Sequence, residues 1–328
     1  MKRVALTLAL PLLVLVAACG DASTRGSSGD TALSVAATTR QVADFARQVG
    51  GDRVAVRNII PANADPHDFE PRPSDARAVA DADVAVQSGG DLDAWLSGLL
   101  DNAGGDAERV SLIDSVKTIE GGHHHEDEHD EEDTAHAEDE HGESGEEVDP
   151  HWWQDPTNVE LAVKRIAAAF AAADPSGKGT YEANAARYVR ELRRLDKDIS
   201  SCLDTVPAER RKLVTNHDAF GYFARRYDIE VLGSIIPALS TNAQPSAGDL
   251  RRLVEAIRRE RVTTIFAESA LNQRLEKAVA RDAGVEVSAA LYGDTLGPDE
   301  NGTYVQALRH DASIIAKGFG AQCALDAG

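Results

Sequence analysis

Two copies of the tripeptide Asp-Pro-His, ending at His67 and His151, place an imidazole directly after a stiffened backbone. Proline fixes φ and removes a backbone donor, so less conformational entropy is lost when the next side chain binds a ligand. The preceding aspartate can cap the following turn, or it can accept the second imidazole N–H and so fix the tautomer. Because imidazoles and carboxylates bind divalent metals, both tripeptides are candidate metal-binding motifs.

Two further residues stand in comparable positions. His217 lies where a predicted strand turns into a helix, and Asp294 lies just past another predicted strand. A single histidine beside a turn is more often a hydrogen-bonded surface residue than a metal ligand. We nevertheless predict one metal site from His67, His151, His217 and Asp294, because all four stand at the loop mouths where open α/β sheets bind ligands.

A His-rich acidic segment, residues 120–149, combines fifteen Asp and Glu with six of the ten histidines and contains no Lys or Arg. The six histidines are His123, His124, His125, His129, His136 and His141. This segment cannot bury enough apolar surface to offset the entropy of ordering, so we expect it to be disordered without metal. Acidic runs are usually solvated linkers, but the density of imidazoles favours a loop that captures metal weakly.

The elements that must position these residues alternate between strand and helix. Before the His-rich acidic segment we predict strands over 32–38, 55–60 and 84–88 and helices over 40–49 and 74–80. After it we predict helices over 159–173, 180–203, 219–226, 248–260 and 272–283 and strands over 213–215, 230–234, 264–267 and 286–288. This alternation indicates βαβ units. The predicted fold class is α/β, with two lobes of mainly parallel sheet joined by one long rigid helix.

Length and charge fit this organisation. The 328 residues, 42% of them hydrophobic, are enough for two lobes with a core each. Fifteen of the 21 net negative charges fall in the His-rich acidic segment, which leaves about −6 on the rest of the chain. Nucleic acid is therefore not an expected partner.

The N-terminus predicts export and lipid attachment. Lys2 and Arg3 precede an apolar run over 4–18, and Cys19 follows small residues in the manner of a bacterial lipobox. Fifteen apolar residues are few for a membrane span, which needs about twenty. We expect cleavage before Cys19, lipid on its sulfur, and a location on the outer face of the cytoplasmic membrane. The alternatives are a plain signal anchor or an incidental cysteine.

The resulting division of the chain is a signal peptide over 1–18, a flexible tether over 19–31, an N-terminal lobe over 32–178, a linking helix over 179–203 and a C-terminal lobe over 204–328. Cys202 and Cys323 remain after lipidation. Outside the cytoplasm such a pair favours a disulfide over a metal site.

At this point the sequence resembles a known family. The likeness is carried by residues 65–75, 149–158, 216–222, 266–269, 291–297 and 302–304 and runs from about Leu33 to the C-terminus. These stretches look like the metal-binding solute-binding proteins of bacterial ABC importers, and more narrowly like their zinc-uptake branch. The His-rich acidic segment sits where zinc members carry a similar insert.

The resemblance implies that one metal is held in the cleft between the lobes by His67, His151, His217 and Asp294. Manganese members commonly have a carboxylate where His217 stands. Three imidazoles with one carboxylate suit tetrahedral Zn²⁺, whereas more oxygen ligands suit Mn²⁺. Where many relatives have Asn in the last helix this chain has His310, to which we assign no metal role.

The expected function is therefore capture of Zn²⁺ as a transported ligand and its delivery to a permease with its ATPase, by a monomer held to the membrane through its lipid. A manganese or iron carrier of the same family is one alternative, and a surface metal buffer or adhesin without a transporter is another. A zinc hydrolase is disfavoured, because Asp294 occupies the fourth ligand position and the chain has no His-Glu-x-x-His run.

Overall fold

The computed structural model describes residues 32–62, 64–121, 147–299, 302–323 and 325. The chain divides into Met1–Thr31 and a unit from Ala32 to Gly328, and every described residue belongs to the second unit. Cys19 and the six histidines of the His-rich acidic segment lie outside the described residues. Among the described helices, none combines the length and the apolar character needed to cross a membrane.

The N-terminal lobe is built on a four-stranded parallel sheet in the order β2-β1-β3-β4. Its strands are β1 (Leu33–Ala37), β2 (Val54–Asn58), β3 (Val84–Gln87) and β4 (Glu108–Ser111). Apolar residues occupy both faces of β1 and β3, as expected for central strands of a parallel sheet covered by helices. The covering helices are α1 (Arg40–Gly50), α2 (Pro73–Ala80) and α3 (Trp95–Ala103).

The C-terminal lobe repeats the α/β pattern with two parallel strand pairs. Its strands are β5 (Lys212–His217), β6 (Glu230–Ile236), β7 (Thr264–Ile265) and β8 (Glu286–Val287). The amide of Phe266 donates to the carbonyl of Val214 at 2.8 Å, which ties the two pairs together just past β7. The helices of this lobe are α6 (Gly221–Arg226), α7 (Ala247–Arg259), α8 (Arg274–Ala283) and α9 (Tyr304–Gly318).

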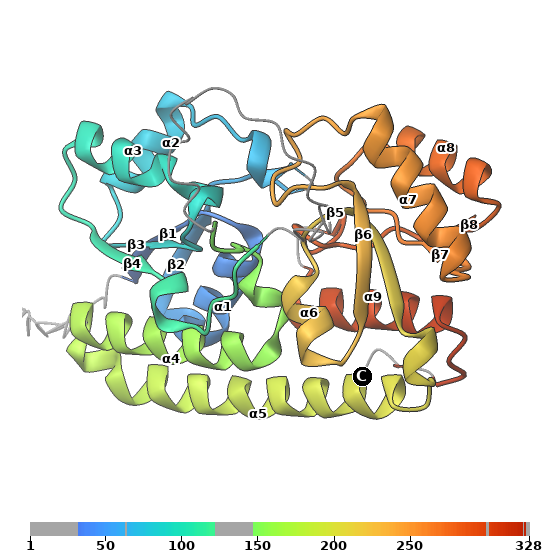
Figure 1. Cartoon of the computed structure of the whole chain (residues 1–328). Helices are drawn as coiled ribbons and strands as arrows, with labels where there is room; N and C mark the ends of the chain where they lie inside the picture. Colours follow the sequence, from blue (N-terminus) through green and yellow to red (C-terminus); the bar gives the residue numbers. More distant parts are fainter. Residues whose placement is uncertain (1–31, 63, 122–146, 300–301, 324, 326–328) are drawn as a thin grey trace, which may run out of the picture. The chain divides into compact units, whose positions relative to one another are not determined.

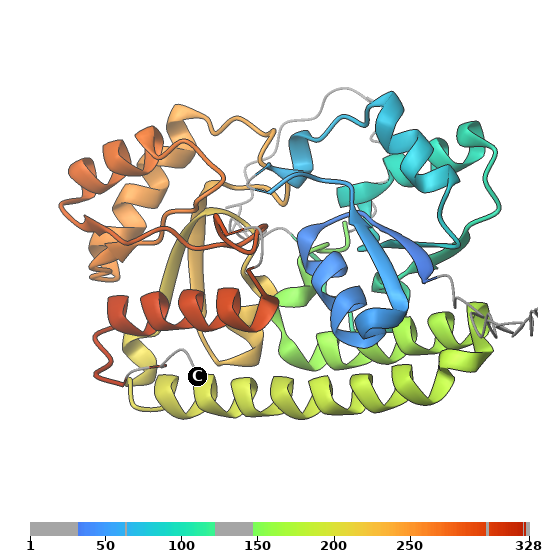
Figure 2. The ribbon, with the colours of Figure 1, turned by 180° about the vertical axis from the view of Figure 1, so that it is seen from behind.

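The long helix α5 (Lys178–Leu203) connects the lobes, and α4 (Pro156–Ala173) before it packs against α1, β3 and β4 of the N-terminal lobe. At 1.5 Å per residue, the 26 residues of α5 span about 39 Å. Figure 1 shows α5 running under both sets of strands, and Figure 2 shows α1 and α9 above it from behind. One buried stripe of α5 faces these elements: Tyr181, Ala185, Tyr188, Leu192, Leu195 and Ile199. The predicted α/β class with one long connecting helix is confirmed.

The largest hydrophobic core is continuous between the lobes. Phe45 of α1, Leu192 of α5, Phe223 of α6 and Ile315 of α9 all belong to it. Two smaller clusters fill the space between the sheets and their outer helices, α2 with α3 and α7 with α8. A shared core of this kind resists wide hinge motion, because opening it would expose apolar surface.

Prediction and structure agree for most elements, with bounds differing by a few residues. Among the α-helices and strands, α3 and β4 were not predicted, and α9 was expected only from the family resemblance, as the last helix that contains His310. The structure also joins Cys202, near the end of α5, to Cys323, beyond α9, by a disulfide with 5.6 Å between the two Cα atoms. The ends of the linking helix and of the C-terminal lobe are thereby tied together.

Candidate metal centre

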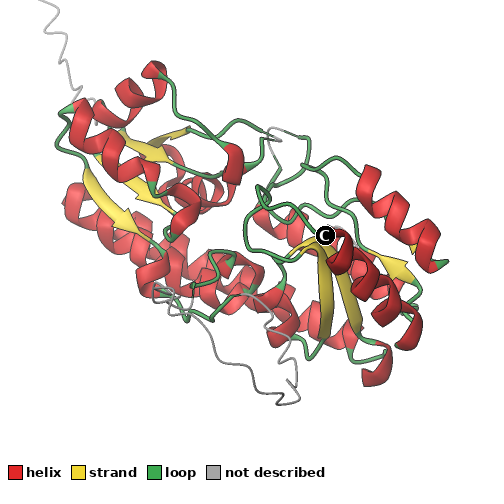
Figure 3. Cartoon of the chain, turned by 45° about the horizontal axis from the view of Figure 1, so that its top comes forward, coloured by secondary structure: helices red, strands yellow, loops and turns green. Residues whose placement is uncertain are grey.

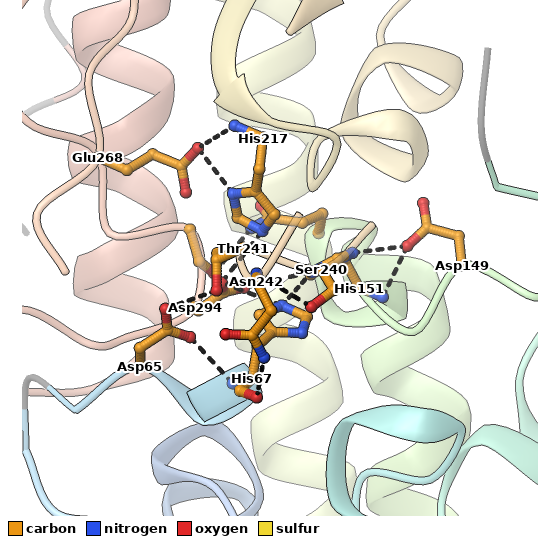
Figure 4. A network of polar contacts seen from close by, with 12 residues as sticks. Asp65, His67, Asp149, His151, His217, Ser240, Thr241, Asn242, Glu268 and Asp294 are labelled. Atoms are coloured by element: carbon orange, nitrogen blue, oxygen red, sulfur yellow. Dashed lines mark hydrogen bonds and ion pairs between the residues drawn. The ribbon is translucent and has the colours of Figure 1, made fainter. Parts of the chain in front are cut away.

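The four residues proposed as ligands converge on one point between the two lobes. One ligand atom from each of His67, His151, His217 and Asp294 lies within 4.8 Å of the other three. The side chains of His151 and His217 are fully buried, and those of Asp294 and His67 are 4% and 6% exposed. The loops that follow the strands of both lobes meet in this region, as Figure 3 shows for the fold and Figure 4 for the side chains.

His67 comes from a 3-10 turn, Pro66–Asp68, in the N-terminal lobe. The Asp65 side chain caps this turn, because its Oδ1 accepts a hydrogen bond from the His67 amide at 2.9 Å. Proline at the first position of the turn needs no hydrogen-bond partner for its nitrogen. The first Asp-Pro-His tripeptide therefore uses its aspartate as a backbone cap.

His151 comes from the second tripeptide and uses its aspartate differently. Asp149 Oδ1 accepts from the His151 amide at 2.8 Å and lies 2.7 Å from the ring Nδ1. With Nδ1–H donated to this carboxylate, Nε2 carries the lone pair that faces the cluster. Asp149 therefore bonds both the backbone amide and the ring of His151. The edge of Trp153 also packs on the His151 ring, with the ring centroids 5.5 Å apart.

His217 is the last residue of β5, so its side chain emerges at the carboxyl end of a strand. Glu268 Oε1 accepts from the His217 amide at 3.1 Å and lies 3.0 Å from the ring Nδ1. Glu268 thus orients His217 as Asp149 orients His151. A Cβ on Gly293 would lie 2.9 Å from Glu268 Oε2, so a larger residue there would displace this carboxylate.

Asp294 lies in a turn that is held from the other lobe. The carbonyl of Gly293 accepts two hydrogen bonds, from Trp153 Nε1 and Gln154 Nε2, each at 3.0 Å. The amide of Tyr292 donates to Asp311 Oδ1 of α9 at 2.8 Å. The segment before α4 that contributes His151 therefore also fixes the backbone that presents Asp294.

The spacing of the ligand atoms matches a four-coordinate metal. Asp294 Oδ2 lies 3.5 Å from His67 Nε2 and 3.2 Å from His217 Nε2, and Asp294 Oδ1 lies 3.5 Å from His151 Nε2. Ligands about 2.0–2.1 Å from a tetrahedral Zn²⁺ are separated by about 3.3 Å. His217 Nε2 and Asp294 Oδ1 are buried without a hydrogen bond from the described residues, so they are free to bind a cation.

The charges of the centre shift the pKa values of its members. Burial disfavours the charged imidazole of His151, but Asp149 and Asp294 outweigh it and raise the pKa of His151. At His217 burial acts in the same direction, and Glu268 and Asp294 raise its pKa well above the ordinary value. Burial of Asp294 is likewise outweighed by His217 and His151, so the pKa of Asp294 lies well below its usual range. A divalent cation replaces protons in this environment.

Sequence reasoning did not assign Glu268 a role at the site. In the sequence, Glu268 stands directly after the predicted strand over 264–267, and this position could have indicated a role. In the structure its carboxylate is buried, and a buried carboxylate requires a partner. Thr241 and Asn242, which contact the His67 turn, carried no recognisable signal. Cys202 and Cys323 are joined to each other, and the metal cluster contains neither of them.

Comparison with known proteins identifies the family. Residues 35–318 match the family described as "Zinc-uptake complex component A periplasmic". The chain belongs to this family. It is therefore a metal-binding solute-binding protein of the kind that serves ABC importers with a permease and an ATPase, located outside the cytoplasm and not an enzyme.

Individual relatives cover nearly the whole chain. The manganese ABC transporter substrate-binding lipoprotein PsaA of Streptococcus mitis is 30% identical over 94% of this chain and 96% of that protein. The manganese-binding lipoprotein MntA of Halalkalibacterium halodurans is 29% identical over 97% of this chain and 99% of that protein. The structure of the periplasmic zinc binding protein TroA from Treponema pallidum superposes with a TM-score of 0.75 at 24% identity, covering 88% of this chain and 99% of that one. The structural similarity to TroA supports the fold described above.

Proposed function

We propose that this family member is the zinc-binding component of an ABC importer, with His67, His151, His217 and Asp294 as the ligands of one transported Zn²⁺. The observation that carries the proposal is the set of three imidazole nitrogens and one carboxylate, whose nitrogen–oxygen distances of 3.2–3.5 Å fit tetrahedral coordination. The carboxylates of Asp149 and Glu268 support it by presenting Nε2 of two histidines to the cation.

Manganese is the second candidate, because relatives nearly 30% identical are named as manganese-binding proteins. The donor set argues for zinc. Mn²⁺ prefers oxygen ligands and six-coordinate geometry, whereas three imidazoles with one carboxylate are typical of zinc. His217 is the residue on which this choice depends, since a carboxylate in its place would give two nitrogen and two carboxylate donors.

The rest of the chain fits the same function. We propose that residues 1–18 are removed, that Cys19 carries the lipid, and that 19–31 tether the lobes over 32–178 and 204–328, with 179–203 linking them. The His-rich acidic segment would collect Zn²⁺ weakly before it reaches the cleft. The loaded monomer would then deliver the metal to its permease and ATPase.

Competitive titration of the purified protein with Zn²⁺ and Mn²⁺ tests the proposal. We expect one tight site for Zn²⁺ and much weaker binding of Mn²⁺. His217→Ala should lower zinc affinity by more than about 100-fold, because loss of an outer-shell partner alone costs 10–100-fold. His217→Glu should narrow the difference between the two metals.

The matched control is His310→Ala, since His310 lies outside the cluster and contacts the carbonyl of Ala290 at 3.0 Å. This variant should keep zinc affinity within about threefold, a change of less than 1 kcal/mol. Zinc affinity of His217→Ala close to that of the unchanged protein would refute the ligand assignment. Tighter binding of Mn²⁺ than of Zn²⁺ would leave the site in place and make the manganese alternative correct.

A further inference from the structure

The turn that presents His67 is held from the C-terminal lobe by two neighbouring side chains. Thr241 Oγ1 donates to Asp65 Oδ2 at 2.7 Å, and Asn242 Nδ2 donates to the carbonyl of His67 at 2.8 Å. Asp65 caps the same turn with its other oxygen. Figure 4 shows Thr241 and Asn242 reaching across to this turn beside the metal cluster. Both contacts are made to the backbone or the cap of His67, so they can fix the ligand without touching the metal.

The segment that carries these side chains, residues 238–242, is also attached beside a second proposed ligand. The carbonyl of Ala238 accepts from the amide of Asp218, the residue after His217, at 3.1 Å. Leu239 is buried, 5% exposed, and its side chain lies against Gly121 of the N-terminal lobe. Asn242 is further braced by its amide, which donates to Ser240 Oγ at 3.2 Å. The 238–242 segment is therefore a short connection between the surroundings of His217 and those of His67.

Two other hydrogen bonds between the lobes near the cluster are buried. Tyr304 Oη donates to the carbonyl of Trp153 at 2.6 Å, and Arg40 Nη1 donates to the carbonyl of Gly297 at 2.6 Å, both in buried surroundings. By contrast, the Asn242 bond is exposed and the Thr241 bond is half-buried. Water can replace an exposed hydrogen bond at little net cost, whereas an unpaired buried group is costly. The two bonds to the His67 turn are accordingly easier to break than these two buried bonds.

We propose that Thr241 and Asn242 are positioning residues that hold His67 in its ligand geometry and thereby set the rate at which the metal leaves. This inference rests on the proposed role of His67 as a ligand. Breaking the two hydrogen bonds frees the 66–68 turn to move with His67. The other three ligands keep their own supports, because Asp149 and Glu268 still hold His151 and His217, and the bonds to the Gly293 carbonyl still hold the turn of Asp294. The segment thus slows release without contributing a donor atom to the cation.

The test measures zinc release from the loaded full-length protein into an excess of chelator, alongside zinc association and affinity. The double variant Thr241→Val with Asn242→Ala removes both donors and leaves their acceptors open to solvent. Release should become about tenfold faster, which corresponds to about 1.4 kcal/mol, and the association rate should change by less than about twofold. The thermal midpoint of the metal-free variant should be unchanged, because the contacts are peripheral.

Two further variants separate positioning from general damage. Thr241→Ser keeps the hydroxyl and should release zinc at the original rate. Asn102→Ala removes an equally exposed side-chain hydrogen bond, from Asn102 Nδ2 to the carbonyl of Gly98 in α3. This variant should release zinc at the original rate. Unchanged release in the double variant would overturn the inference, as would an affinity loss that arises only from slower association. Failure of the unchanged protein to bind Zn²⁺ tightly would instead refute the proposed function.

Discussion

At the scale of the residue, Asp149 and Glu268 determine which imidazole nitrogens point at the metal cluster. They do so from outside the cluster, by contacting the Nδ1 atoms of His151 and His217. Asp149 and Glu268 each hold both the backbone amide and the ring Nδ1 of one histidine. The hydrogen bond from the backbone amide fixes the position of each histidine, and the contact with Nδ1 fixes the orientation of its ring. Because both carboxylates are buried, neither can be lost without leaving an unpaired donor in the interior.

The same carboxylates predict how zinc affinity depends on pH. The pKa of His151 is raised, and that of His217 is raised well above the ordinary 6.5, so protons compete with Zn²⁺ for Nε2 at higher pH than in a free imidazole. Affinity should therefore fall as pH decreases, and the fall should begin above pH 6.5. Titrations across the range from about pH 5.5 to 8.5 would measure it.

Glu268→Gln provides the matched comparison. The change removes the largest charge that raises the pKa of His217, so the onset of the loss of affinity should move to lower pH. A zinc affinity that stays constant down to pH 6 in the unchanged protein would contradict this account.

At the scale of the element, the sequence was sufficient for most strands and helices but not for three of them. β4 is a four-residue edge strand whose only buried side chain is Val110, so no apolar alternation marks it. The buried face of α9 mixes three alanines with larger apolar residues and includes Asp311, and this charged residue interrupts the apolar stripe that normally reveals an amphipathic helix. These elements form because of tertiary contacts: β4 pairs with β3, and α9 packs against α5 and α1.

The same distinction applies to the site. His67, His217 and Asp294 could be predicted to meet because each ends or follows a strand of a parallel sheet, and such positions gather at one edge. His151 stands in the loop before α4, and its Asp-Pro-His motif linked it to the other three. The role of Glu268 depends on its contact with a residue 51 positions away, and that of Thr241 on a contact with Asp65 176 positions away. Contacts between residues this far apart in the chain cannot be predicted from the local sequence around either residue.

The base of the His-rich acidic segment allows a direct test of that segment. Glu120 pairs with Val148 in an antiparallel bridge, and the amide of Gly121 donates to the carbonyl of Glu147 at 2.8 Å. Deleting residues 122–146 would join Gly121 to Glu147 as a two-residue turn of a hairpin, a favourable connection. The deletion should therefore leave the fold and the cleft intact.

Zinc titration of this deletion variant should lose several weak sites and keep one tight site, because all four proposed cleft ligands remain. Calorimetry can count both classes of site. Loss of the tight site with the segment, in a protein that still melts cooperatively, would assign the principal site to the histidines of residues 123–141.

At the scale of the whole molecule, rigidity comes from a shared core and from a covalent tie across it. The continuous core includes residues of α1, α5 and α9, so neither lobe buries its apolar surface alone. The disulfide between Cys202 and Cys323 closes a segment of 121 residues that contains the C-terminal lobe. Cross-linking a segment this long restricts the unfolded chain strongly, and it restricts the native chain little, since the lobe is already held by the core.

The double variant Cys202→Ala with Cys323→Ala should therefore lose stability without losing function. We expect unfolding to become easier by about 2–4 kcal/mol, seen as a thermal midpoint several degrees lower in the metal-free protein. Zinc affinity should stay within about threefold, because the cleft contacts of Trp153, Gln154 and Tyr304 with the opposite lobe do not involve the disulfide. An affinity loss as large as that of His217→Ala would mean that the covalent tie, and not the buried interface, sets the spacing of the ligands. An unchanged thermal midpoint would mean that the native core alone already restrains the C-terminal segment.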